Sequence, residues 1–358
     1  MHADSPKAPR ITHRDIANRL GISQSTISRV LSNHPKVSPD TRKLVLQAVE
    51  AMHYRPDPAL SVLAAHRWPE QRARTVANLA YIILAPRTEY CGSVGSQAQM
   101  RVVRNRAEEL GFGFDCFWLS DYPSGRELSK VLYHRGIEGL ILTGDEEQSR
   151  INLEWSHFCH VALGEDTNLP LCNRVRYDWF DALLKAIDRA LERGYKRIGI
   201  ALMDHQNSVI NQALVSGCFI AGQKLSMLGL PILPTATFQP NQTDGKPLRE
   251  WFHENQPDVV ISSNIRAYYL MDEAGIQFPK AAGFVYLHRS HSPGEERLSA
   301  MDDLCSLRVS RTVELLAQLI HLNQKGILKY PRIMLIQGEW YEGETLPDRH
   351  TESVPLGG

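Results

Sequence analysis

A run of short polar side chains that includes one arginine stands near the N-terminus. The run reads Gln24, Ser25 and Thr26 and, after one apolar residue, Ser28 and Arg29. Amide and hydroxyl groups bond to base edges and phosphates, and the guanidinium fork matches the two acceptors that guanine presents. On one face of a helix, such side chains could read the major groove of DNA.

Two short helices joined by a sharp turn are expected to hold this run. Apolar residues recur at helical spacing over 16–20 and again over 27–31. Gly21 supplies the left-handed backbone that the turn needs, and Ser23 is expected to cap the second helix. A third helix is expected over 38–52, so the three helices form a compact all-α module.

Charge is unevenly divided along the chain. The 358 residues carry 40 Lys/Arg and 40 Asp/Glu, so the formal net charge is zero. Residues 1–75 hold 12 Lys/Arg against 6 Asp/Glu, a net charge of +6, which leaves −6 on the remainder. A basic N-terminal module on an acidic body indicates local binding of phosphate groups.

From Val76 onward, apolar runs alternate with helical segments. Buried strands are expected at 76–85, 112–119, 137–142, 158–163, 197–203, 232–238, 258–262, 282–287 and 332–337, and helices at about 94–110, 124–134, 179–193, 208–228, 245–254, 266–274 and 304–325. This alternation predicts doubly wound parallel sheets with both faces covered. Two series of such units predict two lobes, which divide near 165–178 and cross again near 290–305.

The expected organisation has five parts. They are a disordered arm (1–9), an all-α helix-turn-helix headpiece (10–56), a hinge helix and linker (57–75), a two-lobed α/β core (76–345) and a C-terminal tail (346–358). A length of 358 residues and 43% hydrophobic residues are those of an ordinary globular protein with two or three domains.

The segment from Ile11 to Ala65 resembles, without gaps, the DNA-binding headpiece of the lactose/galactose repressor (LacI/GalR) family. The motifs that carry the resemblance are Asp15-Ile16-Ala17, Gly21-Ile22-Ser23, Thr26-Ile27-Ser28-Arg29-Val30-Leu31, Val37-Ser38-Pro39-Asp40-Thr41-Arg42 and Tyr54-Arg55-Pro56. The α/β body is more loosely similar, over about 76–345, to the family's effector-binding core, a relative of periplasmic sugar-binding proteins.

The resemblance implies a role for each matching residue of the headpiece. Gln24, Ser25 and Arg29 fall where the family reads bases, and Arg29 falls where an arginine reaches a guanine. Positions that mostly contact phosphate, and so fix the register, hold Thr12, Ser23, Thr26, Ser28 and Lys36.

The hinge segment implies contacts in the minor groove. Leu63 falls on the leucine that wedges between central base pairs and kinks the duplex, with plain packing against the core as the alternative. Leu60 is bulkier than the family's usual alanine, and Pro58 replaces a polar or basic residue. Contacts at the operator centre therefore depart from those of the family.

The same resemblance implies an effector site in the core, but three of its usual polar contacts are replaced. The replacements are Leu214, Ile265 and Leu287. Since unpaired buried polar groups are costly, either the ligand is not a typical polyol or the response to a ligand has been lost. The remaining candidate lining residues, which could equally be polar loop residues, are Tyr90, Glu165, Gln239, Asn264 and Arg266.

Other motifs give weak signals for chemistry. The His157-x-x-His160 pair lies on a strand-like run that would point its rings to opposite faces, and His288-x-x-His291 lacks nearby cysteines. Asp302 and Asp303 precede a helix and are expected to cap it. No metal site, cofactor or catalytic motif is expected, so the chain is not predicted to be an enzyme.

The expected location is the cytoplasm. The six cysteines are scattered without a Cys-x-x-Cys pair, as in proteins with reduced thiols. The first residues lack the apolar core of a signal peptide, and no run approaches the roughly 18 apolar residues of a membrane span.

These observations predict a sequence-specific transcriptional regulator, in the first instance a repressor. It would bind a palindromic double-stranded operator as a homodimer and respond to a small-molecule effector in the core cleft. An activator of the same architecture and an effector-insensitive regulator remain open. The headpiece opposes a solute-binding protein, and the absence of leucine heptads after residue 341 favours a dimer over a tetramer.

Overall fold

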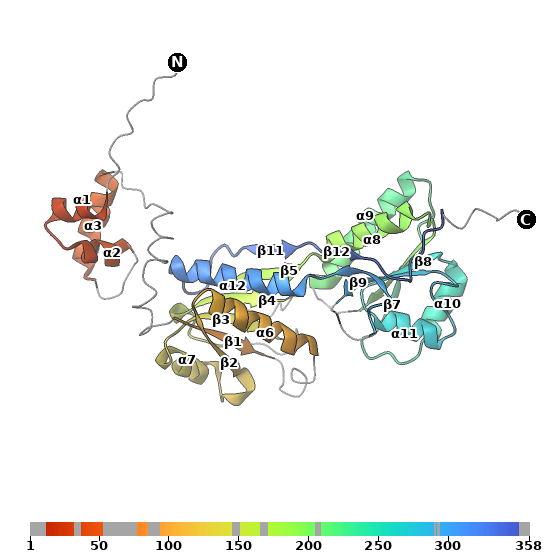
Figure 1. Ribbon diagram of the computed structural model, residues 1–358, viewed down its shortest axis with the longest axis horizontal. Coiled ribbons are helices and arrows are strands. Elements are labelled where there is room, and N and C mark those ends of the chain that lie inside the picture. Colours follow the sequence, from red (N-terminus) through yellow and green to blue (C-terminus); the bar gives the residue numbers. More distant parts are fainter. Residues whose placement is uncertain are drawn as a thin grey trace, which may run out of the picture. The chain divides into compact units, whose positions relative to one another are not determined.

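The chain forms two compact units (Figure 1). The computed structural model describes residues 12–31, 37–52, 77–84, 94–144, 151–164, 171–204, 209–289, 291 and 294–350. The N-terminal unit contains three helices, and the second unit contains every strand of the described chain. The predicted arm, hinge helix and linker lie outside the described residues.

The N-terminal unit packs helices α1 (His13–Leu20), α2 (Gln24–Leu31) and α3 (Pro39–Ala51) around one small core. Ile16, Ile27 and Val45, one from each helix, are fully buried at its centre. Their burial confirms the apolar stripes that the sequence predicts for the first two helices. The side chains between those stripes are thereby left on the outside.

The second unit begins with a six-stranded parallel sheet, which we call lobe 1. Its strands are β1 (Asn78–Ile83), β2 (Gly113–Trp118), β3 (Ile137–Thr143), β4 (Cys159–Leu163), β5 (Asn173–Tyr177) and β11 (Ile333–Ile336), in the order β11-β5-β4-β3-β1-β2. Alternate residues of β1 face opposite sides. Ile82 packs with α7 (Gly125–His134), whereas the hydroxyl of Tyr81 donates to Gln99 of α6 (Val94–Glu109).

Lobe 2 is a second six-stranded sheet between two pairs of helices (Figure 1). Its strands are β6 (Ile198–Met203), β7 (Ala236–Phe238), β8 (Val259–Ser262), β9 (Gly283–Arg289), β10 (Ser299–Asp302) and β12 (Glu339–Tyr341), in the order β12-β10-β9-β8-β6-β7. Helices α8 (Trp179–Glu192) and α9 (Val209–Met227) cover one face, and α10 (Lys246–Asn255) and α11 (Arg266–Glu273) cover the other. The predicted doubly wound architecture is confirmed.

The chain passes between the lobes three times. It crosses between β5 and α8, between β10 and α12 (Cys305–His321), and between β11 and β12. Helix α12 lies beside α6 in lobe 1, where Arg106 pairs with Glu314 at 2.7 Å (Figure 1). The sequence predicts the first two crossings, whereas the third comes from a strand that was not expected.

Several predicted elements need correction. Strands β5, β10 and β12 were not expected, because each is short and carries polar residues in place of an apolar run. The predicted strand at 232–238 is confined to β7, since Pro234 cannot donate a ladder hydrogen bond. Strand β12 pairs antiparallel with β10, so the second sheet is parallel only in its other pairs.

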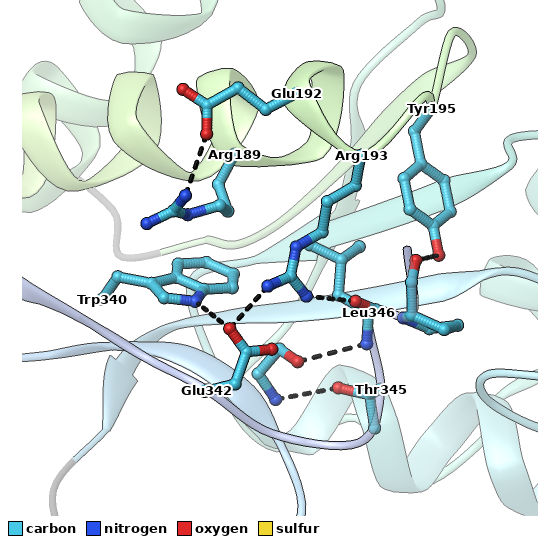
Figure 2. Close-up of polar contacts among 10 residues, drawn as sticks. Arg189, Glu192, Arg193, Tyr195, Trp340, Glu342, Thr345 and Leu346 are labelled. Carbon is cyan, nitrogen blue, oxygen red and sulfur yellow. Dashed lines mark hydrogen bonds and ion pairs between the residues drawn. The ribbon is translucent and has the colours of Figure 1, made fainter. Parts of the chain in front are cut away.

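Residues 346–350, predicted as part of a C-terminal tail, pack against lobe 2 (Figure 2). Leu346 is fully buried in the cluster formed with α8 and α9, and its carbonyl accepts from the guanidinium of Arg193. The hydroxyl of Tyr195 donates to the carbonyl of Pro347 at 3.0 Å. The boundary predicted at 345 is therefore wrong, and the core extends to residue 350.

A neutral histidine lies inside lobe 1. His160 of β4 is 2% exposed, and its ring centroid lies 4.8 Å from that of Trp155. Burial lowers the pKa of His160 from 6.5 to about 4, and a contact with the backbone of Phe158 offsets part of this effect. The folded protein therefore excludes a proton that the unfolded chain accepts.

This difference predicts a loss of stability in acid. Between pH 6.5 and pH 4 the unfolded chain gains the proton first, so His160 should lower the free energy of unfolding by about 3 kcal/mol. Urea unfolding of the parent and of His160→Leu at pH 7 and pH 4.5 measures the part of the acid-induced loss in the free energy of unfolding that is due to His160. The variant should lack this part. The exposed His253→Leu serves as the control and should keep the parent's pH dependence. Equal acid losses in the parent and His160→Leu would contradict the assignment.

Candidate nucleic-acid interface and lobe hinge

The turn between α1 and α2 is fixed by its backbone, and a reciprocal cap fixes the start of α1. Gly21 adopts a left-handed conformation (φ 64°), and the amide of Ile22 donates to the carbonyl of Ala17 at 3.2 Å. At the other end of α1, the backbone amide of Thr12 donates to the carboxylate of Asp15 at 2.7 Å, and the Thr12 hydroxyl accepts in return. The entry to α2 is set by the turn at Gly21.

The outer face of α2 carries the predicted base-reading residues. Gln24, Ser25, Ser28 and Arg29 are exposed, whereas Ile27 and Val30, on the opposite side, are buried in the headpiece core. The apolar stripe thus holds the helix so that two hydroxyls, one amide and one guanidinium point away from the protein. This face, which we call the α2 face, is built for hydrogen bonding outside the chain.

Hydroxyl groups gather at the N-terminus of α2. The hydroxyl of Ser23 accepts from the amide of Thr26 at 3.2 Å and lies 2.7 Å from that of Ser25 and 2.8 Å from that of Thr26. A helix N-terminus with hydroxyls beside it favours an anion such as a phosphate. Ser23 caps α2, as the sequence predicts, and Thr12, to which the resemblance assigns only a contact with phosphate, caps α1.

Five predicted site residues lie outside the part of the chain that the structure describes. They are Lys36, Leu60 and Leu63 of the predicted DNA interface and Tyr90 and Glu165 of the predicted effector site.

The structure brings the other three candidate effector residues to one edge of lobe 2, where its strands end. Gln239 follows β7, and its side chain donates to the carboxylate of Asp204 after β6 at 3.1 Å. The guanidinium of Arg266 donates to the carbonyl of Gln242 at 2.7 Å, while the oxygen of Asn264 accepts from the Arg266 amide at 2.9 Å. Gln242 links the two groups, because its side-chain oxygen accepts from the backbone amide of Gln239 at 3.3 Å.

The apolar replacements have structural positions. Leu214 and Leu287 are fully buried in the core cluster beneath α8 and α9, and Ile265 packs against the opposite cluster. These side chains therefore fill the interior of lobe 2 where polar groups were expected to serve a ligand. None of these three side chains places a polar atom at this edge of lobe 2.

A cluster at the second crossing was missed by sequence reasoning. Asp303, 1% exposed, lies 3.2 Å from the Nε2 atom of His288 and accepts from the guanidinium of Arg308 at 2.8 Å. The ring of His288 stacks on that of Trp179 at 4.9 Å, next to the first crossing. Burial opposes ionisation of Asp303, but the contacts with His288 and Arg308 outweigh it and lower the pKa of Asp303.

The neighbouring carboxylate holds a second set of groups. Asp302 lies 2.9 Å from both Arg289 and His291, and the guanidinium of Arg289 stacks 3.6 Å from the centre of the Tyr341 ring. The predicted cap of α12 is confirmed, since both carboxylates accept backbone amides at its start. The signal in the sequence that could have revealed this cluster is the pair of acidic residues at a predicted crossing.

The third crossing packs against the other two. A Cβ atom at Gly338 would lie 2.7 Å from the hydroxyl of Tyr177 and 2.8 Å from the carbonyl of Asp302. The Tyr177 hydroxyl also donates to the carbonyl of Leu287 at 2.8 Å. The three crossings therefore meet in one packed region, the lobe hinge. Within the described ranges, no three His, Cys, Asp or Glu side chains form a metal-binding group.

The described chain thus combines a helix-turn-helix unit with a two-lobed α/β core. Residues 12–57 match the family model described as bacterial regulatory proteins, lacI family. This segment of the chain is therefore similar to that family of regulators.

Known regulators are similar to parts of this chain. The transcriptional regulator GalS of Salmonella typhimurium is 52% identical over 54 residues, which cover 15% of this chain and 16% of GalS. The operon regulator NtdR of Bacillus subtilis is 26% identical over 192 residues, or 52% of this chain and 53% of NtdR. The chain spans about half the length of this relative, and less of GalS.

The fold also agrees with that of a solved regulator. The Lac repressor dimer, bound to its operator and the anti-inducer ONPF, gives a TM-score of 0.53 at 16% identity, with 94% of this chain and 99% of that chain covered. No helix in the described part of the chain is long and apolar enough to cross a membrane.

The buried carboxylate of the hinge yields a prediction. Asp303→Asn removes the charge that compensates Arg308 and should lower the free energy of unfolding by about 3–5 kcal/mol. Urea unfolding at pH 7 measures the change. Glu344→Gln, which breaks the exposed pair with Arg297, should cost less than about 1 kcal/mol. A loss in Asp303→Asn no larger than this control would show that the hinge does not need the carboxylate.

Proposed function

We propose that this protein is a sequence-specific transcriptional repressor that binds a palindromic operator as a homodimer in the cytoplasm. The α2 face carries the proposal, because its exposed polar residues are held outward by a complete apolar core beneath them. A two-fold symmetric dimer presents two such faces, and two half-sites related by the same symmetry match them.

Each α2 helix would lie in a major groove. Gln24, Ser25 and Arg29 would contact base edges, and Arg29 would pair with a guanine. The groups proposed to contact phosphate, and so to fix the register, are Thr12, Ser23, Thr26, Ser28 and Lys36. Leu60 and Leu63 would enter the minor groove at the operator centre.

A small polar molecule bound between the lobes would control DNA binding. Gln239, Asn264 and Arg266 would provide its contacts in lobe 2, with Tyr90 and Glu165 as further candidates. A ligand that prefers one degree of lobe closure shifts the population of that state, and the hinge would transmit the shift. The hydrogen bonds of Gln239 with Asp204 and of Arg266 with Gln242 support this role, because a polar ligand can replace them with hydrogen bonds of its own.

A band-shift assay tests the DNA-binding role. Purified protein should retard a palindromic fragment taken from a genomic library at low nanomolar concentration, as specific regulators do. Failure to retard any palindrome would refute the regulator. Placement of the bound site over a promoter distinguishes repression from activation.

Substitution of the arginine on the α2 face gives a sharper expectation. Arg29→Ala should cost about 1–3 kcal/mol of specific affinity and relax the preference at one base pair, while nonspecific binding changes little. Titrations on operator and random DNA separate the two effects. Gln47→Ala, an exposed change on α3, serves as the control. Equal losses on both DNAs would make Arg29 a phosphate contact.

The effector site is tested by thermal unfolding with candidate ligands. At 100 times its Kd, a bound ligand should stabilise the protein by about 2.7 kcal/mol, and Asn264→Ala should weaken this effect. The trial set is sugars, sugar acids and nucleobases. Stabilisation of the parent and the variant to the same degree would place the ligand elsewhere, and none at all would favour the effector-insensitive regulator.

A further inference from the structure

Strand β11 lies at one edge of lobe 1 and is paired along one side only, with β5 (Figure 1). Amides of β5, and of the residue that follows it, donate to the carbonyls of Arg332 and Ile336 at 2.9 and 3.0 Å. Because a parallel ladder uses every second residue of a strand, the backbone groups of Ile333 and Leu335 point away from β5. In the part of the chain that the structure describes, no other strand pairs with them.

The side chains of β11 are apolar and exposed on both faces of the sheet. Ile333 and Leu335, on one face, are 53% and 52% exposed, and Met334, on the other, is 38% exposed. Tyr330, which precedes the strand, is 79% exposed and extends this surface. We call these four residues together the β11 edge. The neighbouring strand β5 is buried at four of its five positions, so the described cover of the sheet ends at β5.

The β11 edge lacks the usual protection of an edge strand. Soluble proteins protect such strands with charged residues or prolines inside the strand, with bulges, or with a covering helix or loop. The strand Ile333–Ile336 is apolar throughout and pairs with β5 in unbroken register. By contrast β2, at the other edge of the same sheet, contains Asp115. An unprotected apolar edge is typical of a strand on which another strand docks.

Positive charge lies beside this edge. Lys325, Lys329 and Arg332 precede the strand and are exposed, and the chain from 325 to 337 contains no acidic residue. None of the three cations forms an ion pair with a described residue. The backbone amide of Arg332 donates to the side chain of the buried Asn173 at 2.7 Å, so the start of the strand is held against β5. The edge therefore combines free backbone groups, apolar side chains and uncompensated positive charge.

We infer that the β11 edge binds an extended segment of another protein, whose acidic part lies beside Lys329 and Arg332 and whose apolar part pairs with β11. Main-chain hydrogen bonds to the outward groups of Ile333 and Leu335 provide the affinity of such strand addition. The side chains of the added strand cover the apolar residues on both faces of the sheet. Acidic residues of the segment complement the cations and select this partner over others.

Three other occupants match the edge less well. A second copy would bring the same cations and no acidic residue to complement them. A lipid surface offers no ordered partners for the outward backbone groups. DNA offers phosphates to the cations but nothing to the apolar side chains of Ile333, Met334 and Leu335.

Fluorescence anisotropy of a labelled peptide with the full chain tests the inference, and it does so without DNA, independently of the proposed function. The probe is a short end-capped peptide with glutamates in one half and alternating Val and Thr in the other, and it should bind. The same peptide with lysines in place of the glutamates should bind at least about tenfold more weakly. A version N-methylated throughout the Val and Thr half should not bind, because it lacks the main-chain donors.

Substitutions on the edge locate the binding. Leu335→Pro removes an N–H that points away from β5, so the sheet should remain while probe binding weakens about tenfold. Leu335→Val keeps this N–H and should bind as the parent does. Arg332→Glu should weaken binding of the glutamate probe and strengthen binding of the lysine probe. Arg249→Glu, an exposed change on α10 of lobe 2, is the matched control and should have no effect.

Several results would overturn the inference. They are a parent that does not bind the glutamate probe, equal binding of the glutamate and lysine probes, and equal binding by Leu335→Pro and Leu335→Val. Far-ultraviolet circular dichroism and urea unfolding show whether each variant is folded, and Arg332→Glu decides the test if Leu335→Pro is not. Self-association that Leu335→Pro abolishes, or binding to anionic lipid vesicles that Arg332→Glu abolishes, would assign the edge to a second copy or a membrane, against the inference.

Discussion

The carboxylates of Asp302 and Asp303 fix the place where the chain passes from lobe 2 into α12. Asp303 holds His288 from β9 and Arg308 from α12, and Asp302 holds Arg289 at the end of the same β9 strand. A buried charge that loses its partner is costly, so these pairs restrict how α12 moves against β9. Any ligand-induced change in lobe closure is subject to this restriction, because all three crossings pack around the two carboxylates.

The surface that we assign to DNA matches the chemistry of that partner. The α2 face presents hydroxyls, an amide and a guanidinium, which suit the polar edges and phosphates of DNA. The α2 face is outward because a complete apolar core lies beneath it.

The headpiece was predictable because its signals are local. A glycine turn, two capping residues and apolar residues at helical spacing lie within about 20 residues, and each acts on its own neighbours. The long strands of the sheets were predictable for a similar reason, since an apolar run between helices is buried on both faces. Strands β5, β10 and β12 were not, because their pairing depends on distant strands rather than on their own composition.

The candidate effector edge was predicted in part. Gln239, Asn264 and Arg266 were named from their positions after strands, and the structure joins them through Gln242, which accepts from the amide of Gln239 and from the guanidinium of Arg266. The hinge cluster was not predicted. His288 and Asp303 are 15 positions apart, and each resembles an ordinary loop residue when read alone.

The sequence by itself determined the headpiece, the alternation of strands and helices, and the polar run on α2, because these follow from the spacing of residues close in the chain. Only the tertiary structure decided which residues meet at the lobe hinge and where the core ends. Those features depend on contacts between segments far apart in sequence. Residue spacing records which face of an element is apolar, but not what packs against that face.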